Sequence, residues 1–161
     1  MEIFLGIDPG LATVGFGVIQ KEGNQLRHVG HGTIRTPSAL PAGERLRLIK
    51  TDLVSLFQEY NPCSVGIEKL FFSQNTKTAL QVAEARGVIV ETVFSHHLPF
   101  FEMTPLQIKN DVCGDGGADK IQIQRMVKQL LSLASPPRSD DAADALAIAI
   151  YTSRVYKAKN I

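Results

Sequence analysis

The first part of the chain consists of short apolar runs separated by turn residues. Residues 3–8 are densely apolar, residues 14–20 form a run rich in glycine and β-branched side chains, and residues 27–35 form a third. Turn signals such as Asp8-Pro9-Gly10 lie between these runs. Short strands joined by turns are typical of an antiparallel meander. The pattern therefore predicts three strands that pair consecutively.

The spacing of apolar residues changes after Pro41. Leucine and isoleucine then recur every three or four positions up to Leu56, which is typical of an amphipathic helix. Residues 65–67 read as a short buried strand that runs into Glu68, and residues 100–103 as a fifth strand. Between them, residues 78–94 predict a helix that is apolar on more than one face. Such a helix is expected to pack against the sheet and against a second surface, such as another subunit.

Three further helices are predicted in the last third of the chain. Thr104 with Gln107 and Asp119 with Gln122 are spaced as capping boxes, and Ser139 caps the last helix. The resulting order, β-β-β-α-β-α-β-α-α-α, predicts a single α/β domain over residues 1–161. We expect a five-stranded mixed sheet, with three antiparallel strands followed by parallel strands and helices on both faces. Residues 152–161 are expected to be a short mobile tail.

Composition narrows the class of protein only a little. The chain has 161 residues, a net charge of +1, and two cysteines, Cys63 and Cys113, that form no CxxC pair. We expect reduced thiols and a soluble, cytoplasmic protein with no membrane association, because the apolar segment 142–151 is about half of a membrane span. A near-neutral charge suits a nucleic-acid enzyme only if the acids gather in one site and the bases surround it.

Carboxylates follow two of the predicted strands. Asp8 comes after a run of apolar residues, and Glu68 follows the strand at residues 65–67. A charge at a buried strand end costs free energy unless it is paired, capped or bound to a metal. Taken singly, Asp8 also fits an Asx turn with Pro9, and Glu68 also fits a solvent-facing strand end.

Two more carboxylates lie on the last predicted helix. Asp144 interrupts a stretch of alanine, leucine and isoleucine, and Asp141 lies three residues earlier, on the same side. Stacked like charges repel each other unless a cation lies between them. Acids in the first helical turn interact favourably with the helix dipole, which accounts for Asp140 and Asp141 but not for Asp144.

These four oxygen donors have no cysteine or histidine at ligand spacing beside them. Such a set suits Mg²⁺ or Mn²⁺ better than zinc. Two such ions about 4 Å apart activate a water and stabilise the leaving oxygen in phosphoryl transfer. The residues alone therefore predict a metal-dependent phosphoryl-transfer enzyme.

Four segments together resemble the RuvC family of bacterial Holliday junction resolvases, which belong to the RNase H-like superfamily. The segments are GIDPGLATVGFGV, GIEKLFFSQN, CGDGGADK and DDAADALAIA, and the resemblance covers about residues 3–151. It implies a Mg²⁺-dependent endodeoxyribonuclease, active in homologous recombination and DNA repair. It also implies a homodimer that binds a four-way junction and makes paired symmetric nicks, leaving 5′-phosphate and 3′-hydroxyl ends. The partner that it implies is the RuvA–RuvB branch-migration complex.

The resemblance also assigns roles to residues. It implies that the metal ligands are Asp8, Glu68, Asp141 and Asp144, which hold two Mg²⁺ ions once DNA is bound, with Mn²⁺ as a substitute. It implies that Lys109 and Lys120 contact phosphate or stabilise transition-state charge, and that Phe71 stacks on unpaired bases. Residues 75–86 resemble the helix of the dimer interface. Without the resemblance, helical lysines are surface cations by default, and one of two adjacent phenylalanines belongs to the core.

The chain departs from the family pattern at two places. Asp140 adds an acid beside Asp141, on nearly the same helix face relative to Asp144. The family register favours Asp141 as the ligand, whereas helix geometry alone allows either. The tail is also shorter than the family's basic tail, which predicts a weaker nonspecific affinity for DNA.

Three other functions fit parts of the sequence. Actin-like ATPases begin with a similar strand and Asp-Gly turn, but they need two lobes and a second phosphate loop. A relative of the YqgF-like branch that trims RNA would use the same carboxylates, although Phe71 and the DAADALA helix favour junctions. A junction-binding protein without catalysis would have no use for four clustered acids.

Overall fold

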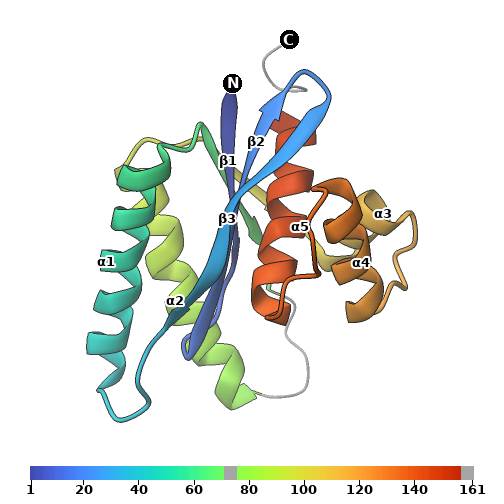
Figure 1. The fold of residues 1–161 in the computed structure, drawn as a ribbon. Coiled ribbons are helices and arrows are strands. Elements are labelled where there is room, and N and C mark those ends of the chain that lie inside the picture. The colour runs from blue at the N-terminus through green and yellow to red at the C-terminus, as the bar shows by residue number, and fades with distance from the viewer. Residues whose placement is uncertain (71–75, 157–161) are drawn as a thin grey trace.

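The computed structural model of the protein describes residues 1–70 and 76–156, and its centre is a five-stranded sheet (Figure 1). Strands β1 (Glu2–Asp8), β2 (Thr13–Glu22) and β3 (Gln25–Arg35) pair antiparallel in succession. Strand β4 (Ser64–Glu68) pairs parallel with β1, and β5 (Phe100–Met103) pairs parallel with β4, which gives the order β3-β2-β1-β4-β5. The predicted mixed sheet is confirmed.

Helices cover both faces of this sheet, as predicted. Helices α1 (Ala42–Tyr60) and α2 (Thr76–Ser95) lie on one face (Figure 1). Helices α3 (Pro105–Cys113), α4 (Lys120–Leu130) and α5 (Asp140–Val155) lie on the other. Each side has its own hydrophobic core, because successive strand residues face opposite layers. Leu5 and Ile7 pack toward α1 and α2, whereas Phe4 packs toward α5.

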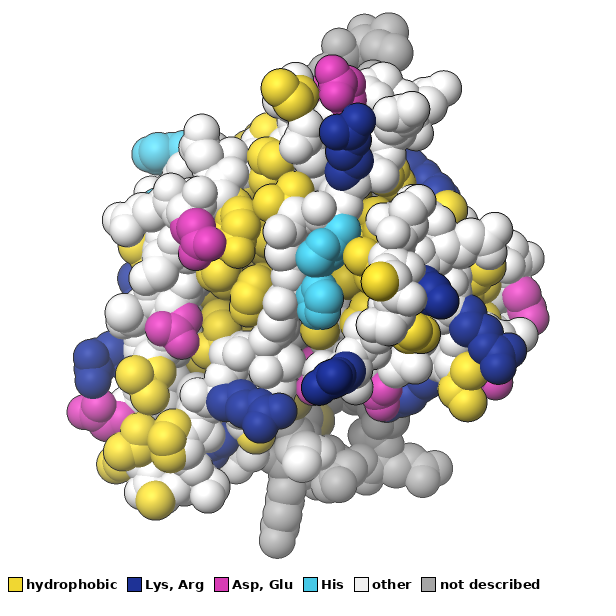
Figure 2. Space-filling model, in the orientation of Figure 1, with side chains coloured by type: hydrophobic (Ala, Val, Ile, Leu, Met, Phe, Trp, Pro, Cys, Tyr) yellow, Lys and Arg dark blue, Asp and Glu magenta, His cyan; other side chains and the backbone are white. Residues whose placement is uncertain are grey.

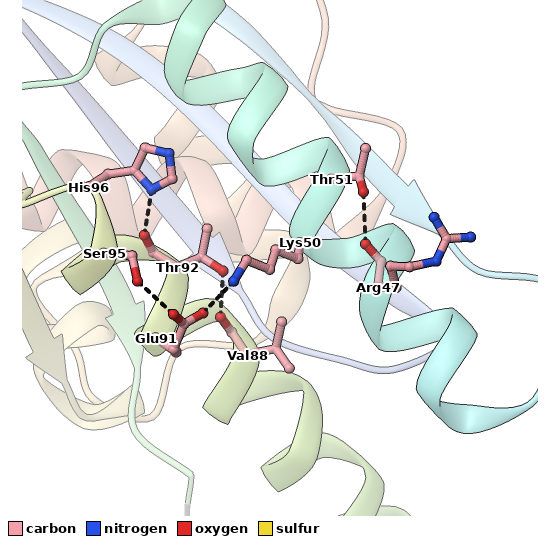
Figure 3. Close-up of polar contacts among 8 residues, drawn as sticks. All are labelled: Arg47, Lys50, Thr51, Val88, Glu91, Thr92, Ser95 and His96. Carbon is pink, nitrogen blue, oxygen red and sulfur yellow. Dashed lines mark hydrogen bonds and ion pairs between the residues drawn. The ribbon is translucent and has the colours of Figure 1, made fainter.

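The layer of α1 and α2 is held mainly by apolar packing. A stripe on α2, formed by Ala85, Ile89 and Val93, is fully buried. Figure 3 shows the polar contacts at the edge of this layer, where Lys50 Nζ donates to Glu91 Oε2 at 2.9 Å. Such an exposed ion pair contributes little to stability, because water and salt screen it.

A row of glycines brings α5 very close to the sheet. Gly66, Gly6 and Gly17 are in register across β4, β1 and β2. A Cβ atom on any of these three would run into α5, either its backbone or the side chain of Thr152. The facing surface of α5 is rich in alanine, so small residues on both sides permit the approach. The helix that carries two candidate carboxylates is thus seated directly on β1 and β2.

The C-terminal helix continues further than predicted. We expected a tail from residue 152, but α5 extends to Val155, and Thr152 and Ser153 are fully buried. Lys21 Nζ donates to the Ser153 carbonyl at 2.5 Å, and the Tyr156 ring packs against Phe4 with 5.4 Å between centroids. The predicted start of the tail was therefore wrong. Residues 157–161 lie outside the described part of the chain.

The surface mixes charges of both signs. In Figure 2, basic and acidic side chains are interspersed over the face that is shown. Among the described residues, no helix is long and apolar enough to cross a membrane.

Candidate active site

Two of the predicted site residues lie side by side at one edge of the sheet. Strands β1 and β4 are parallel neighbours with Ile7 opposite Ile67, so the next residues, Asp8 and Glu68, end the two strands together. The carboxyl ends of parallel strands meet at the same edge of a sheet, where α/β proteins place their sites. Both carboxylates are partly buried there.

Helix α5 brings the other two carboxylates to the same edge. Asp8 is opposite Gly15 in the β1–β2 ladder, and a Cβ atom on Gly15 would collide with the backbone of Asp141. The first turn of α5 therefore lies directly over the end of β1. Asp144 follows one turn later and is also partly buried. The structure thus brings all four predicted carboxylates into one region.

The electrostatics of Asp8 show how closely these groups interact. Its pKa is raised to about 8, first by burial and then by the negative charges of Asp144, Glu68 and Asp141, while Lys120 opposes the shift. A carboxyl with this pKa is mostly protonated at neutral pH. The positive charge near it is too small to compensate for its burial and for the neighbouring negative charges. A bound cation would supply that charge.

The neighbouring carboxylates have raised pKa values for the same physical reasons. Burial raises the pKa of Glu68 to about 7, with a further contribution from Asp144, and Lys109 lowers it. Burial also raises the pKa of Asp144 to about 6, with contributions from the charges of Asp140 and Asp141, while Lys120 and Lys109 lower it. Clusters of strongly perturbed carboxyls are characteristic of functional sites.

Both predicted lysines line a small pocket at this cluster. The pocket has a volume of about 130 Å³, and its lining includes Glu68, Asp144, Lys109 and Lys120. Helices α3 and α4 each begin with a complete capping box, at Thr104 and Asp119, which fixes the turn before each lysine. The pocket therefore combines two carboxylates with two ammonium groups.

Asp140 forms its side-chain contacts with α4. Its Oδ2 accepts from Lys120 Nζ at 3.1 Å, and its Oδ1 accepts from Gln124 Nε2 at 2.8 Å. The charges of Asp140 and Asp141 both raise the pKa of Asp144, and that of Asp141 also raises the pKa of Asp8. The sequence alone does not separate these two acids, and it does not single out Gln124. The signal for Gln124 is its position one helical turn after Lys120.

Phe71, predicted to stack on bases, lies outside the described residues, as does the start of the segment 75–86. Within the described part of the chain, no three Asp, Glu, His or Cys side chains already lie close enough to hold one ion. Mg²⁺ commonly binds through one or two carboxylates, with waters and substrate phosphates as its other ligands. The hard oxygen donors and their raised pKa values therefore fit such a cation.

The sheet order, with carboxylates ending β1 and β4 and beginning α5, defines a nuclease of the RNase H-like class. The chain belongs to the RuvC family, because the family model "Crossover junction endodeoxyribonuclease RuvC" matches residues 4–152. The family resemblance in the sequence is thereby confirmed.

Similar proteins agree with this assignment over nearly their whole length. Crossover junction endodeoxyribonuclease RuvC of Alkaliphilus oremlandii is 53% identical, over 92% of this chain and 90% of that protein. The RuvC of Halothermothrix orenii is 49% identical, over 96% of this chain and 94% of the relative. T. thermophilus RuvC in complex with a Holliday junction substrate superposes with a TM-score of 0.91 at 29% identity, covering 99% of this chain and 97% of that one.

Proposed function

We propose that this protein cuts four-way (Holliday) junction DNA by paired symmetric nicks, through cation-dependent hydrolysis that leaves 5′-phosphate and 3′-hydroxyl ends. The observation that carries the proposal is the convergence of Asp8, Glu68, Asp141 and Asp144, where burial and then the three neighbouring charges raise the pKa of Asp8 to about 8. A DNA phosphate would be repelled by these acids unless cations lay between them. Membership of the RuvC family supports junction DNA as the substrate.

The four carboxylates would hold Mg²⁺, two ions once DNA is bound, with Mn²⁺ as a substitute. Oxygen donors of this kind suit hard divalent cations. When bound, the ions supply an activated water and stabilise the charge that develops on the leaving oxygen. The chain's own contribution is to fix the ligands on two strand ends and a helix that is seated against them.

The two lysines would bind the phosphate on the open side of the cluster. Lys109 is partly buried beside Glu68 and Asp144, whose pKa values it lowers, so its ammonium lies near the reacting groups. Lys120 is at the pocket mouth, with 70% of its side chain exposed. An ammonium in such a site stabilises the negative charge that grows on a phosphate as it reacts. Phe71, on the segment after β4, would stack on unpaired bases near the crossover.

The protein would act as a homodimer, as paired nicks require, with the RuvA–RuvB branch-migration complex as its partner. Helix α2 supports dimerisation. Its buried stripe faces the sheet, yet Leu80 is 68% exposed on another side of the helix. A large exposed leucine within residues 75–86, the segment that resembles the family's dimer helix, is a natural interface residue.

The test is cleavage of a synthetic four-way junction by wild type and D8N, with Mg²⁺ and with EDTA. We expect D8N to cut at least about 100-fold more slowly, because a lost ligand costs several kcal/mol of transition-state stabilisation. Junction binding by D8N should be retained. D52N is the matched control, because Asp52 is an exposed acid on α1, on the opposite face of the sheet from α5, and it should cut like wild type.

The competing substrates are tested in the same assay. Structured RNA and a linear duplex at equal molarity should be cut much more slowly than the junction. Equal rates for D8N and wild type would refute the proposed mechanism. A preference for RNA or linear duplex would refute the substrate.

A further inference from the structure

Lys120 stands at an unusual place for a lysine. It is the first residue of α4, where the helix dipole disfavours a positive charge, and the first turn of α4 contains no acid. With 70% of its side chain exposed, such a lysine would ordinarily extend freely into water. Its ammonium instead lies 3.1 Å from Oδ2 of Asp140, on a different helix. The contact therefore joins α4 to the first residue of α5.

Asp140 is held on both of its oxygens. Besides the contact with Lys120, its Oδ1 accepts from Gln124 Nε2 at 2.8 Å. Lys120 and Gln124 are one turn apart on α4 and so present their polar groups on the same face. The two contacts together orient the Asp140 carboxylate toward α4.

Lys120 also has a second set of anions within reach. It lines the pocket with Glu68 and Asp144, and its charge acts on Asp144 and Asp8. A lysine ammonium is a compact charge on a flexible four-carbon stem. Without Asp140, the cluster carboxylates would be its strongest remaining partners. An ammonium among them would offset the negative charge that draws a divalent cation into the site.

The geometry points to Asp140 as a positioning residue that, oriented by Gln124, keeps the Lys120 ammonium at the mouth of the site and out of the carboxylate cluster. In this position Lys120 faces an incoming DNA phosphate, and the cluster stays open to its cation. The inference rests on the proposed cation site. It gives Asp140 a role distinct from that of Asp141, although the two acids are adjacent.

The experiment measures Mn²⁺ binding to the DNA-free protein by electron paramagnetic resonance. D140N keeps the size of the side chain and an oxygen for Gln124, but it loses the charge that holds Lys120. We expect D140N to weaken Mn²⁺ binding about two- to fivefold, the range that an exposed ion pair contributes. In a K120M background, the same substitution should change binding much less. K120M alone should bind Mn²⁺ more tightly than wild type.

D111N is the matched control, because Asp111 forms an exposed ion pair with Arg154 at 2.7 Å between α3 and the end of α5. It should leave Mn²⁺ binding unchanged. In junction cleavage, excess Mn²⁺ should restore kcat in D140N but not in D144N, which lacks a proposed ligand.

Two results would overturn the role of Asp140. One is an unchanged affinity in D140N, and the other is an equal loss of affinity in the wild-type and K120M backgrounds, which would mean that Asp140 acts on the cation directly. D8N separates these results from failure of the proposed function. If D8N binds Mn²⁺ as tightly as wild type, the cation site itself is wrong, and the inference falls with it.

Discussion

The carboxyl of Asp8 binds a proton in the folded protein that it releases when the chain unfolds. Its folded pKa is about 8, against 3.8 for the unperturbed group. Between these values the native state binds more protons than the unfolded state, so stability falls as pH rises. Deprotonation leaves a buried negative charge among other acids. The cation-free protein should therefore be most stable on the acid side of neutrality.

This predicts a pH-dependent difference between wild type and D8N in thermal unfolding with EDTA. At pH 8.5 the melting temperature of D8N should exceed that of wild type by several degrees, since each kcal/mol corresponds to about 2–4 °C at this size. The difference should shrink as the pH falls from 8 and disappear only below about pH 3.8, because above that pH the unfolded carboxyl is ionised and unfolding releases a proton. A constant difference at all pH values would contradict the assigned pKa. Adding Mg²⁺ at pH 8.5 should stabilise wild type more than D8N.

At the scale of single residues, the sequence predicts which carboxylates belong to the site better than it predicts which way each side chain points. Asp8, Glu68 and Asp144 can be singled out because a carboxylate at a strand end or on an apolar helix is costly without a partner. Asp140 and Asp141 cannot be separated, because both suit the first turn of a helix. Their difference arises from α4, whose Lys120 and Gln124 attract one of the two. A contact between distant segments leaves no local pattern.

At the scale of elements, the seating of α5 on the sheet sets the geometry of the site. Gly15 lies opposite Asp8 in the β1–β2 ladder, and a methyl group there would collide with the carbonyl of Asp141. Overpacking of this kind typically costs about 1–3 kcal/mol. It would also displace the start of α5 relative to Asp8.

We therefore expect G15A to lose more activity than stability. Junction cleavage should fall about 100-fold, the effect of a 1 Å misplacement of catalytic groups, while the melting temperature falls by about 2–12 °C. G43A is the matched control, because a Cβ atom at Gly43 of α1 meets nothing within 4 Å. Alanine there should leave cleavage unchanged and stabilise the helix by about 0.5–1 kcal/mol. Full cleavage activity in G15A would contradict the close seating of α5.

Most helices and strands can be predicted, because the spacing of apolar residues and the helix-capping residues indicate the same elements along the chain. The capping boxes at Thr104 and Asp119 predict the starts of two helices correctly from local residue types. The end of α5 is missed, since Thr152 and Ser153 look like surface residues in sequence. They are buried because Gly66 leaves room beneath Thr152 and because Lys21 bonds to the Ser153 carbonyl. The glycines of β1, β2 and β4 indicate close packing only through their register across the sheet, which no local pattern contains.

At the scale of the whole molecule, the proposed homodimer would depend on α2. Leu80 is the residue that we expect at the centre of the proposed interface. L80D should convert the dimer to a monomer in sedimentation equilibrium, because two charges would face each other across the symmetry axis. On a supercoiled plasmid with a cruciform, the wild type should then produce linear DNA, and L80D mainly nicked circles.

Leu40 offers a matched control for this variant, because it is also a partly exposed leucine but lies outside α2. L40D should remain dimeric and produce linear DNA. An L80D protein that sediments as a dimer would place the interface elsewhere. A monomeric L80D that still linearises the plasmid would show that paired nicks do not need a dimer.

The glycine row beneath α5 has a consequence for how the enzyme loses activity on heating. The helix that supports Asp141 and Asp144 is also the element whose residues from Ala145 to Ile150 are fully buried. Local unfolding that moved these carboxylates would have to expose the centre of the core. Its free energy would be nearly that of global unfolding. Heat inactivation and melting should thus be one event. Substitutions that raise the melting temperature would therefore have to lie in loops and on the surface. A substitution in the core beneath α5 would also move the carboxylates of Asp141 and Asp144.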